Sequence, residues 1–229
     1  MRRIGRFFKR LLLTLFFAHL AYIVALKWIN PPITLTQINS LIEGHGLKRD
    51  YIAYDEMPVS AKLAVIASED QLFAIHNGFD QKSIEKALEF NDKKKGEKVR
   101  GASTISQQVA KNVFLWQKRS WFRKGLEVYF TFMIEWIWGK ERILEMYLNV
   151  AEMGIGTFGI EAASQRYFQK PAKNLTNNEA ARIAVNLPNP KKYRVHPPSP
   201  YVSKRAVWAE RQMRNLSGDP DIIKLLEKK

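Results

Sequence analysis

An acidic pair, Glu69 and Asp70, closes an apolar stretch and is the first feature of the sequence suited to catalysis. Alanine, valine and isoleucine precede Glu69, and such apolar surroundings raise the pKa of a carboxyl group. A carboxylate whose pKa is shifted toward neutrality can act as a general base or acid. Phe73 and His76 follow at helical offsets before Gly78 breaks the helix, so we expect acid, ring and imidazole to line one concave edge.

A second polar segment, GASTISQQVAKN, spans residues 101–112. Ser and Thr side chains at a helix start act as caps, and the free amide groups there attract anions. Two consecutive glutamines and a lysine one turn later favour hydrogen bonding to a polar, charged group. The segment therefore predicts an anion or phosphate site. Its candidate residues are Ser103, Thr104, Ser106, Gln107, Gln108 and Lys111.

A cluster of cations follows, arranged around a single glutamate, Glu127. Guanidinium groups bind phosphate oxygens in pairs, so this cluster is suited to a diphosphate. Trp121 and Phe122 lie among the cations and also fit an amphipathic helix at a membrane surface. Both interpretations can hold together. The cations are Lys118, Arg119, Arg123 and Lys124.

Other kinds of site are poorly supported. The chain has no cysteine, which excludes disulfides, a thiolate nucleophile and Cys-ligated zinc. The four histidines do not form an HExxH motif, and no GxSxG motif is present. The segment SIEK, residues 83–86, matches SxxK but lacks the partner motifs, so we interpret it as chance.

The net charge of the chain narrows the class of partner. Lysine and arginine number 37 against 22 acidic residues, a formal charge of +15. A natural partner is therefore anionic, whether nucleic acid, phospholipid or a phosphorylated substrate. The 229 residues are enough for one domain of ordinary size with a hydrophobic core.

The N-terminus predicts a membrane anchor. Residues 1–10 carry five basic side chains and no acid, and an apolar run follows up to Lys27 and Trp28. We expect a cytoplasmic basic segment at 1–10 and a transmembrane helix at 11–28, with the body outside the cytoplasmic membrane. A cleaved signal peptide is the alternative, but no convincing small-x-small cleavage site precedes Lys27. Basic residues beyond an anchor disfavour nucleic-acid binding.

The remaining chain indicates a mainly α domain at 56–229, joined to the anchor by a membrane-proximal linker at 29–55 with one short helix at most. Pro58 and Ser60 predict a helix start. Residues 91–100 are rich in lysine and are expected to be a mobile loop, either a solvated charge run or a flap over an anionic substrate. Alternating strand patterns are almost absent. Two further helices are indicated by one apolar face, Ile143, Leu144, Tyr147 and Leu148, and by a capping box, Thr176 with Glu179.

Five segments in this order resemble the successive motifs of the peptidoglycan glycosyltransferase family, the lysozyme-like module of class A penicillin-binding proteins and its monofunctional relatives. They are EDQLFAIHNGFD, GASTISQQVAKN, RKGLE, KERILEMYLNV and ARIAVNLPNPKKYRVHPPSP, and they cover residues 69 to 200. The chain stops at residue 229, so we expect a monofunctional member without a transpeptidase domain. The resemblance implies a lysozyme-like glycosyltransferase domain behind one N-terminal transmembrane helix.

The resemblance also implies a reaction, the polymerisation of lipid II. The acceptor's GlcNAc 4-hydroxyl attacks C1 of the growing chain's MurNAc and expels undecaprenyl diphosphate, with inversion from an α-linked donor to a β1,4 bond. Glu69 would be the base, and Glu127 would lie at the diphosphate. The cations there would be Lys111, Arg119, Arg123 and Lys124. The residues lining the same cleft would be Ser103, Thr104, Gln107, Gln108 and Asn112.

Some positions carry less information. Asp70, Phe73 and His76 match family positions without separate chemical steps. The sequence departs from the family at Lys86, where Arg is frequent, and at Ser106, where Thr is usual. No metal site is predicted, although a divalent cation such as Mg²⁺ or Mn²⁺ at the diphosphate stays open. Expected partners are lipid II, the growing glycan strand and membrane lipids, and proteins of cell-wall synthesis or division also stay open.

Two rival functions remain at this point. Lysozyme-like folds also cleave glycans, so a muramidase or lytic transglycosylase is one alternative. A scaffold that binds cell-wall proteins or anionic lipid is the other. The cationic cluster between Lys111 and Lys124 discriminates against a hydrolase, which has no need of it on neutral glycosidic bonds.

Overall fold

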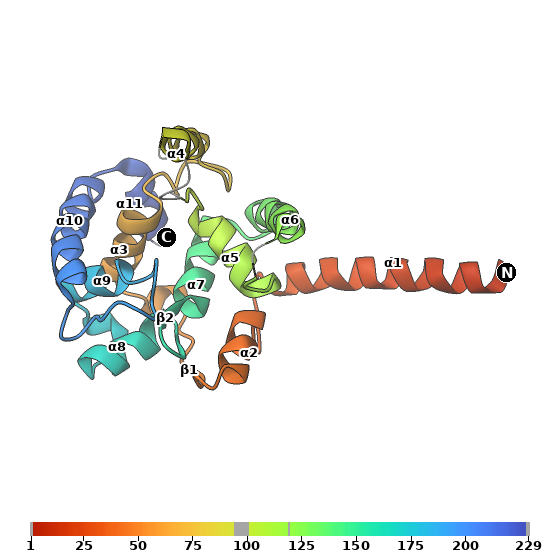
Figure 1. The fold of residues 1–229 in the computed structure, drawn as a ribbon, viewed down its shortest axis with the longest axis horizontal. Coiled ribbons are helices and arrows are strands. Elements are labelled where there is room, and N and C mark those ends of the chain that lie inside the picture. Colours follow the sequence, from red (N-terminus) through yellow and green to blue (C-terminus); the bar gives the residue numbers. More distant parts are fainter. Residues whose placement is uncertain (1, 94–100, 119, 228–229) are drawn as a thin grey trace.

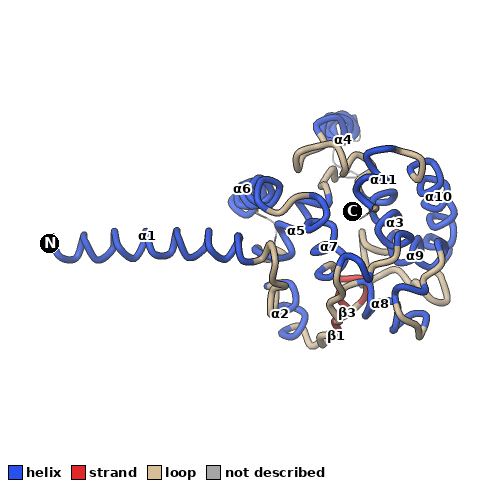
Figure 2. Tube along the Cα trace, turned by 180° about the vertical axis from the view of Figure 1, so that it is seen from behind, coloured by secondary structure: helices blue, strands red, loops and turns tan. Residues whose placement is uncertain are grey.

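The computed structural model describes residues 2–93, 101–118 and 120–227, and this part of the chain is mainly helical, as the sequence predicts (Figure 1). A compact group of helices forms the body, and one long helix, α1, projects from it (Figures 1 and 2). The α-helices are α1 (Arg2–Ala25), α2 (Leu35–Ile42), α3 (Val59–Glu69), α4 (Gln81–Lys93), α5 (Ile105–Phe114), α6 (Trp121–Ile137), α7 (Lys140–Val150), α8 (Ile160–Phe168), α9 (Asn177–Ala184), α10 (Pro200–Leu216) and α11 (Pro220–Leu226).

Short elements complete the described chain. Two 3₁₀ turns cover Tyr54–Glu56 and Ala172–Asn174. Three strands form one small sheet in the order β1-β3-β2, in which β1 is parallel and β2 antiparallel to β3. The strands are β1 (Lys48–Arg49), β2 (Glu152–Gly154) and β3 (Thr157–Phe158). With two or three residues each, they are too short for the alternation by which a strand is recognised in a sequence.

The hydrophobic core lies around α3, α5, α7 and α9. Helix α3 packs against α9 and α10, and α5 packs against α6 and α7. The apolar face expected on α7 is confirmed, because Ile143, Leu144, Tyr147 and Leu148 are all fully buried. The capping box expected before α9 is also confirmed, with the Thr176 hydroxyl accepting from the Glu179 amide.

Helix α3 ends earlier than the sequence suggested. It starts directly after Pro58 and stops at Glu69, because the backbone of Asp70 leaves the helical conformation, with φ −161° and ψ 81°. Phe73 and His76 therefore lie on turns after the helix, and the prediction that they continue it up to Gly78 is wrong. The ring of Phe73 is fully buried in the core, so it does not line a concave edge.

Helix α1 is the one described helix long and apolar enough to cross a membrane, over Gly5–Ala25. It begins at Arg2 and ends at Ala25, so it includes much of the basic segment and stops short of residue 28. Its far end enters the body of the protein, where Ile23 and Leu26 are buried. The candidate membrane helix and the domain thus share part of one core.

Side chains from the domain also bond carbonyl groups in the last turn of α1 and just beyond its end. The Trp138 indole donates to the Ile23 carbonyl at 2.8 Å. The Arg142 guanidinium donates to the Leu26 carbonyl at 2.9 and 3.0 Å and to the Ile29 carbonyl at 2.9 Å. These bonds fix the direction in which α1 leaves the domain.

The segment expected as a linker, residues 29–55, is folded onto the domain. Helix α2 contacts α5, and the Thr36 hydroxyl donates to the Asn112 carbonyl at 3.2 Å. Strand β1 pairs with β3 through Lys48 and Arg49. The single short α-helix expected in this segment is confirmed, but the segment as a whole is not a free tether.

The first part of the loop expected at residues 91–100 is helical. Residues 91–93 form the last turn of α4, so the helix continues further than expected. Residues 94–100 lie outside the described residues.

Candidate active site

The carboxylate of Glu69 is held by a chain of hydrogen bonds from two other helices. It lies half-buried at the end of α3, and Gln108 on α5 donates to it from Nε2 at 2.8 Å. The hydroxyl of Tyr147 on α7 donates to Oε1 of the same glutamine at 3.2 Å. Because the Tyr147 hydroxyl bonds the carbonyl oxygen of Gln108, the amide group must present its NH₂ to Glu69.

Several charges act on the protonation of Glu69. Burial raises the pKa of its carboxyl group above the ordinary value of 4.5, and the negative charge of Asp70 raises it further. The hydrogen bond from Gln108 and the positive charges of Lys111 and Arg205 oppose this rise in pKa. The net shift is upward, which makes Glu69 a better proton acceptor than an exposed glutamate.

The start of α5 is a buried capping box, which confirms the predicted helix start. The Thr104 hydroxyl accepts from the Gln107 amide at 3.2 Å, and the Gln107 side chain accepts from the Thr104 amide at 3.0 Å. Thr104 also donates to the Gly78 carbonyl at 2.7 Å. Both side chains are thus occupied within the protein and orient α5, whereas Ser103 just before them is exposed.

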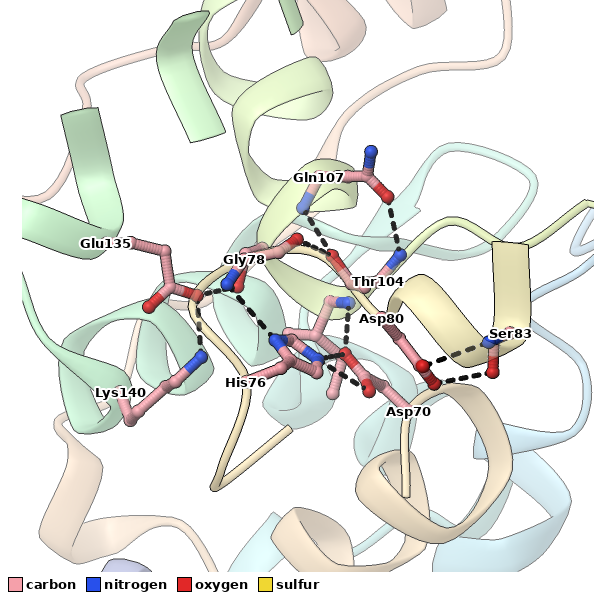
Figure 3. Close-up of polar contacts among 11 residues, drawn as sticks. Asp70, His76, Gly78, Asp80, Ser83, Thr104, Gln107, Glu135 and Lys140 are labelled. Atoms are coloured by element: carbon pink, nitrogen blue, oxygen red, sulfur yellow. Dashed lines mark hydrogen bonds and ion pairs between the residues drawn. The ribbon is translucent and has the colours of Figure 1, made fainter. Parts of the chain in front are cut away.

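Asp70, the neighbour of Glu69 in the chain, forms a second network with His76 (Figure 3). One carboxylate oxygen of Asp70 accepts from the Ile105 amide and from His76 Nε2, each at 3.0 Å. The Gly78 amide donates to His76 Nδ1 at 3.1 Å. An Nδ1 that accepts carries no proton, so this bonding pattern assigns a neutral imidazole with its proton on Nε2. Asp70 thereby ties the end of α3 to the start of α5.

The turn at Gly78 is needed for this network. Its φ of +86° is unfavourable for residues with a side chain, and an added Cβ would lie 2.8 Å from Thr131 Cγ2. Nearby, Glu135 on α6 accepts from the Ser106 hydroxyl at 2.5 Å and from Lys140 Nζ at 2.6 Å (Figure 3). These contacts join the loop after α3 to α5, α6 and α7.

The cationic cluster is built at the start of α6. Glu127 is 3% exposed, and its two oxygens accept from Arg123 Nη1 at 2.6 Å and Lys124 Nζ at 2.5 Å. Glu127 lies one turn after Arg123 and Lys124 on the same helix. The Nε of Arg123 is buried and has no hydrogen-bond partner among the described residues.

Lys111 interacts electrostatically with both glutamates. Burial lowers the pKa of its ammonium group, and the charges of Arg123 and Lys124 lower it further, while Glu127 and Glu69 both raise it. The two halves of the predicted site therefore meet at Lys111. The charge of Lys111 is partly withdrawn from water. Electrostatic attraction is stronger away from water, so Lys111 would compensate the charge of an anion bound there effectively.

Two further predicted residues contribute differently. Asn112 is buried, and its backbone carbonyl accepts from Thr36. Arg119 lies outside the described residues. The structure thus brings Glu69, Gln108 and Lys111 together with the cluster on α6, while Asp70, Phe73, His76, Thr104 and Gln107 lie in the framework that holds them.

The cluster on α6 does not fit a metal held by the protein. A Mg²⁺ or Mn²⁺ site needs free carboxylate or carbonyl oxygens. Both oxygens of Glu127 are already bonded to Arg123 and Lys124. In the described part of the chain, no group of three or more His, Asp or Glu side chains comes together.

Sequence reasoning missed two residues that act on Glu69. Tyr147 had been placed only on the apolar face of its helix, yet its hydroxyl orients Gln108. A tyrosine in an otherwise aliphatic stripe is a signal, because a buried hydroxyl needs a partner. Arg205 on α10 lowers the pKa of Glu69 from 136 positions further along the chain, and no local pattern indicated that contact.

The fold and the site together place a half-buried glutamate of raised pKa near a cluster of cations, the arrangement expected of an enzyme that acts on an anionic substrate. A model of the Transglycosylase family matches residues 35–214, and the chain belongs to this family. The resemblance inferred from the five motifs is thereby confirmed.

Curated relatives support the same assignment. Proteins named biosynthetic peptidoglycan transglycosylase include one of Pseudomonas aeruginosa, 46% identical over 214 residues and covering 91% of each chain. One of Shewanella oneidensis is 46% identical over 219 residues, 94% of this chain and 93% of the relative. One of Xanthomonas campestris pv. campestris is 47% identical over 208 residues, 88% of this chain and 84% of the relative.

Proposed function

We propose that this peptidoglycan glycosyltransferase polymerises lipid II into linear β1,4-linked glycan and releases undecaprenyl diphosphate. One observation carries the proposal: Glu69, with its raised pKa, shares Lys111 with the Arg123, Lys124 and Glu127 cluster. A proton acceptor and a cluster of cations therefore both lie within electrostatic range of one lysine. That is the arrangement a displacement at a glycosyl diphosphate requires.

In the proposed reaction Glu69 takes the proton of the acceptor's GlcNAc 4-hydroxyl. The oxygen forms a new bond to C1 of the MurNAc at the end of the growing strand. The bond between C1 and the diphosphate oxygen breaks, and its electron pair leaves with the diphosphate. Attack from the face opposite the leaving group inverts the α-linked donor to a β linkage in one displacement.

The leaving diphosphate is stabilised by charges already in place. Lys111 supplies a partly desolvated ammonium group, and Arg123 supplies the positive charge of its guanidinium group. Glu127 holds Arg123 and Lys124 in position by accepting from both. Such fixed donors need no reorganisation when charge develops on the leaving group. By similarity to the family, Arg119 joins them.

The membrane arrangement follows from α1 and α6. We infer that α1 is retained as a single-pass anchor with the N-terminus inside and the catalytic domain outside, because its basic end favours the cytoplasm. Burial of Ile23 and Leu26 within the domain also supports retention, since a signal peptide would be removed. Trp121 and Phe122 on α6 are 93% and 72% exposed on an element packed beside α1, as expected at a bilayer surface.

Incubation of the full-length protein with labelled lipid II in detergent micelles tests the proposal. Long glycan strands and free undecaprenyl diphosphate are the expected products. Cleavage of added glycan without synthesis would instead support a muramidase or lytic transglycosylase, and unchanged substrate would support a non-enzymatic scaffold. A parallel reaction with EDTA shows whether a divalent cation carried by the diphosphate takes part.

A further inference from the structure

Helix α10 carries a groove of about 580 Å³ that the mechanism above does not use. Its lining side chains recur at three- and four-residue spacing, so they share one stripe of the helix. The opposite stripe, which includes Val202, Ala206 and Ala209, is buried against the core. The groove is lined by Tyr201, Lys204, Arg205, Val207, Trp208 and Arg211.

The groove is positively charged and has flat aromatic surfaces. In the described part of the chain, no acidic side chain forms an ion pair with Lys204, Arg205 or Arg211. The Arg205 guanidinium stacks on the Trp208 ring at 3.4 Å from its centroid. Lys204 and Arg211 are exposed, so their charges are open to an anionic ligand.

The groove lies near Glu69, the proposed catalytic base. The positive charge of Arg205 acts on Glu69, and the negative charge of Glu69 acts in turn on Tyr201. Gln212, one turn beyond Trp208, accepts a hydrogen bond from Gln71 two residues after Glu69. A ligand in the groove would therefore be continuous with the sugar whose hydroxyl meets Glu69.

The groove on α10 also lies far from the candidate membrane helix, α1. In both views α10 lies at the end of the body opposite α1 (Figures 1 and 2). A diphosphate joined to a lipid must stay near the bilayer, on the side of α1 and α6. The groove on α10 is thus placed for a part of the substrate that carries negative charge but no lipid.

We propose that the groove on α10 binds the carboxylates of the peptides carried by the glycan, with Lys204 and Arg211 as their partners. This rests on the proposed polymerase function, since a peptidoglycan is a glycan bearing peptides and free peptide ends are carboxylates. Ammonium and guanidinium groups bind carboxylates through charge-assisted hydrogen bonds. The aromatic faces of Trp208 and Tyr201 add apolar contact for sugar rings or peptide side chains.

Binding of lipid-free glycan oligomers to the full-length protein in detergent micelles tests this inference. One fluorescent oligomer carries its peptides, and the matched oligomer has had them removed. We expect the peptide-bearing oligomer to bind more tightly. Exchange of both cations, Lys204→Glu with Arg211→Glu, should weaken its binding about tenfold, as expected when two exposed ion pairs are lost. Binding of the peptide-free oligomer should not change.

Arg214→Glu is the matched control, because Arg214 is exposed on the same helix but outside the groove. The milder pair Lys204→Gln with Arg211→Gln should give a smaller loss of the same kind, with an unchanged melting temperature. Equal affinity of the native protein for both oligomers, or no effect of either double variant, would overturn the inference. Binding needs no turnover, so failure to polymerise lipid II would count against the proposed function alone.

Discussion

Gln108 on α5 donates a hydrogen bond of 2.8 Å to Glu69 at the end of α3, and this contact links the two helices that form the site. The bond stabilises the ionised carboxylate, whereas burial and Asp70 favour the protonated form. The protonation of the base is therefore a balance that substitutions on neighbouring elements can shift in either direction. The predictions below use this balance and the contacts that support it.

Glu69→Gln should keep the fold and abolish polymerisation. The amide is nearly the same size but cannot accept the hydroxyl proton, and loss of a general base costs on the order of 10²–10⁴-fold in rate. Turnover of labelled lipid II is the measurement. Glu89→Gln, the same change at an exposed position of α4, is the control and should have normal activity. Near-normal turnover by Glu69→Gln would remove this residue from the mechanism.

In a plot of kcat/KM against pH, the midpoint of the acid limb should lie above pH 4.5, the ordinary pKa of a glutamate. The base must be ionised to work, and a raised pKa keeps it protonated up to a higher pH. Gln108→Met removes a hydrogen bond that lowers the pKa of Glu69, so the limb should move to higher pH. A limb that stays in place in this variant would mean that another group controls the acid side.

Asp70→Asn should move the same limb in the opposite direction. Removal of its negative charge lowers the pKa of Glu69. An asparagine carbonyl at the oxygen that accepts from Ile105 keeps that bond, whereas its NH₂ group loses the bond that His76 Nε2 makes to the other oxygen at 2.9 Å. The pH profile of kcat/KM, measured beside that of the native protein, checks the direction. A shift to higher pH would contradict the assigned charge effect.

Tyr147→Phe should lower kcat/KM about tenfold without unfolding the domain. The change removes the hydroxyl that bonds Gln108 and leaves a buried amide oxygen without its donor. An unsatisfied buried acceptor costs about 1–3 kcal/mol of free energy. Gln108 is then free to turn its oxygen toward Glu69. Kinetics with lipid II and thermal unfolding are measured together. An unchanged kcat/KM with a lowered melting temperature would assign Tyr147 a purely structural role.

The parts of this site that depend on neighbouring residues could be predicted from the sequence. A capping box, an apolar stripe and a glutamate after aliphatic residues are all readable from spacing, and Thr104, Leu144 and Glu69 lie where such patterns placed them. Contacts between distant segments were not readable. Arg205 reaches Glu69 only because α10 packs against α3, and that packing depends on the whole core.

The end of α3 shows why local patterns also fail. Helical spacing from Glu69 to His76 is satisfied on paper, but Asp70 bonds the Ile105 amide and the backbone leaves the helix there. The orphan amide at the start of another helix is a tertiary partner, and it outweighs the local tendency. The same competition places Phe73 in the core.

Arg142→Met should destabilise the protein through α1. Arg142 donates to the carbonyl groups of Leu26 and Ile29 beyond the end of α1, and charge-assisted hydrogen bonds contribute about 1.5–3 kcal/mol each. The exposed Arg214→Met is the matched control. Thermal unfolding in detergent micelles should show a lower melting temperature for Arg142→Met alone. Equal melting temperatures would mean that the buried Ile23 and Leu26 suffice to hold the helix.

No covalent glycosyl intermediate should form on either glutamate. A retaining enzyme needs two carboxyl groups about 5–5.5 Å apart, one of which attacks C1, whereas inversion through one displacement needs a single base and a wider gap. Both oxygens of Glu127 are bonded to Arg123 and Lys124, so this carboxylate is not free to attack. We expect the carboxyl groups of Glu69 and Glu127 to be more than about 6.5 Å apart, the lower bound for inverting glycosidases. Mass spectrometry of enzyme quenched with acid during turnover should find no sugar on either residue, and a glycosyl ester on Glu69 or Glu127 would overturn the single-displacement mechanism.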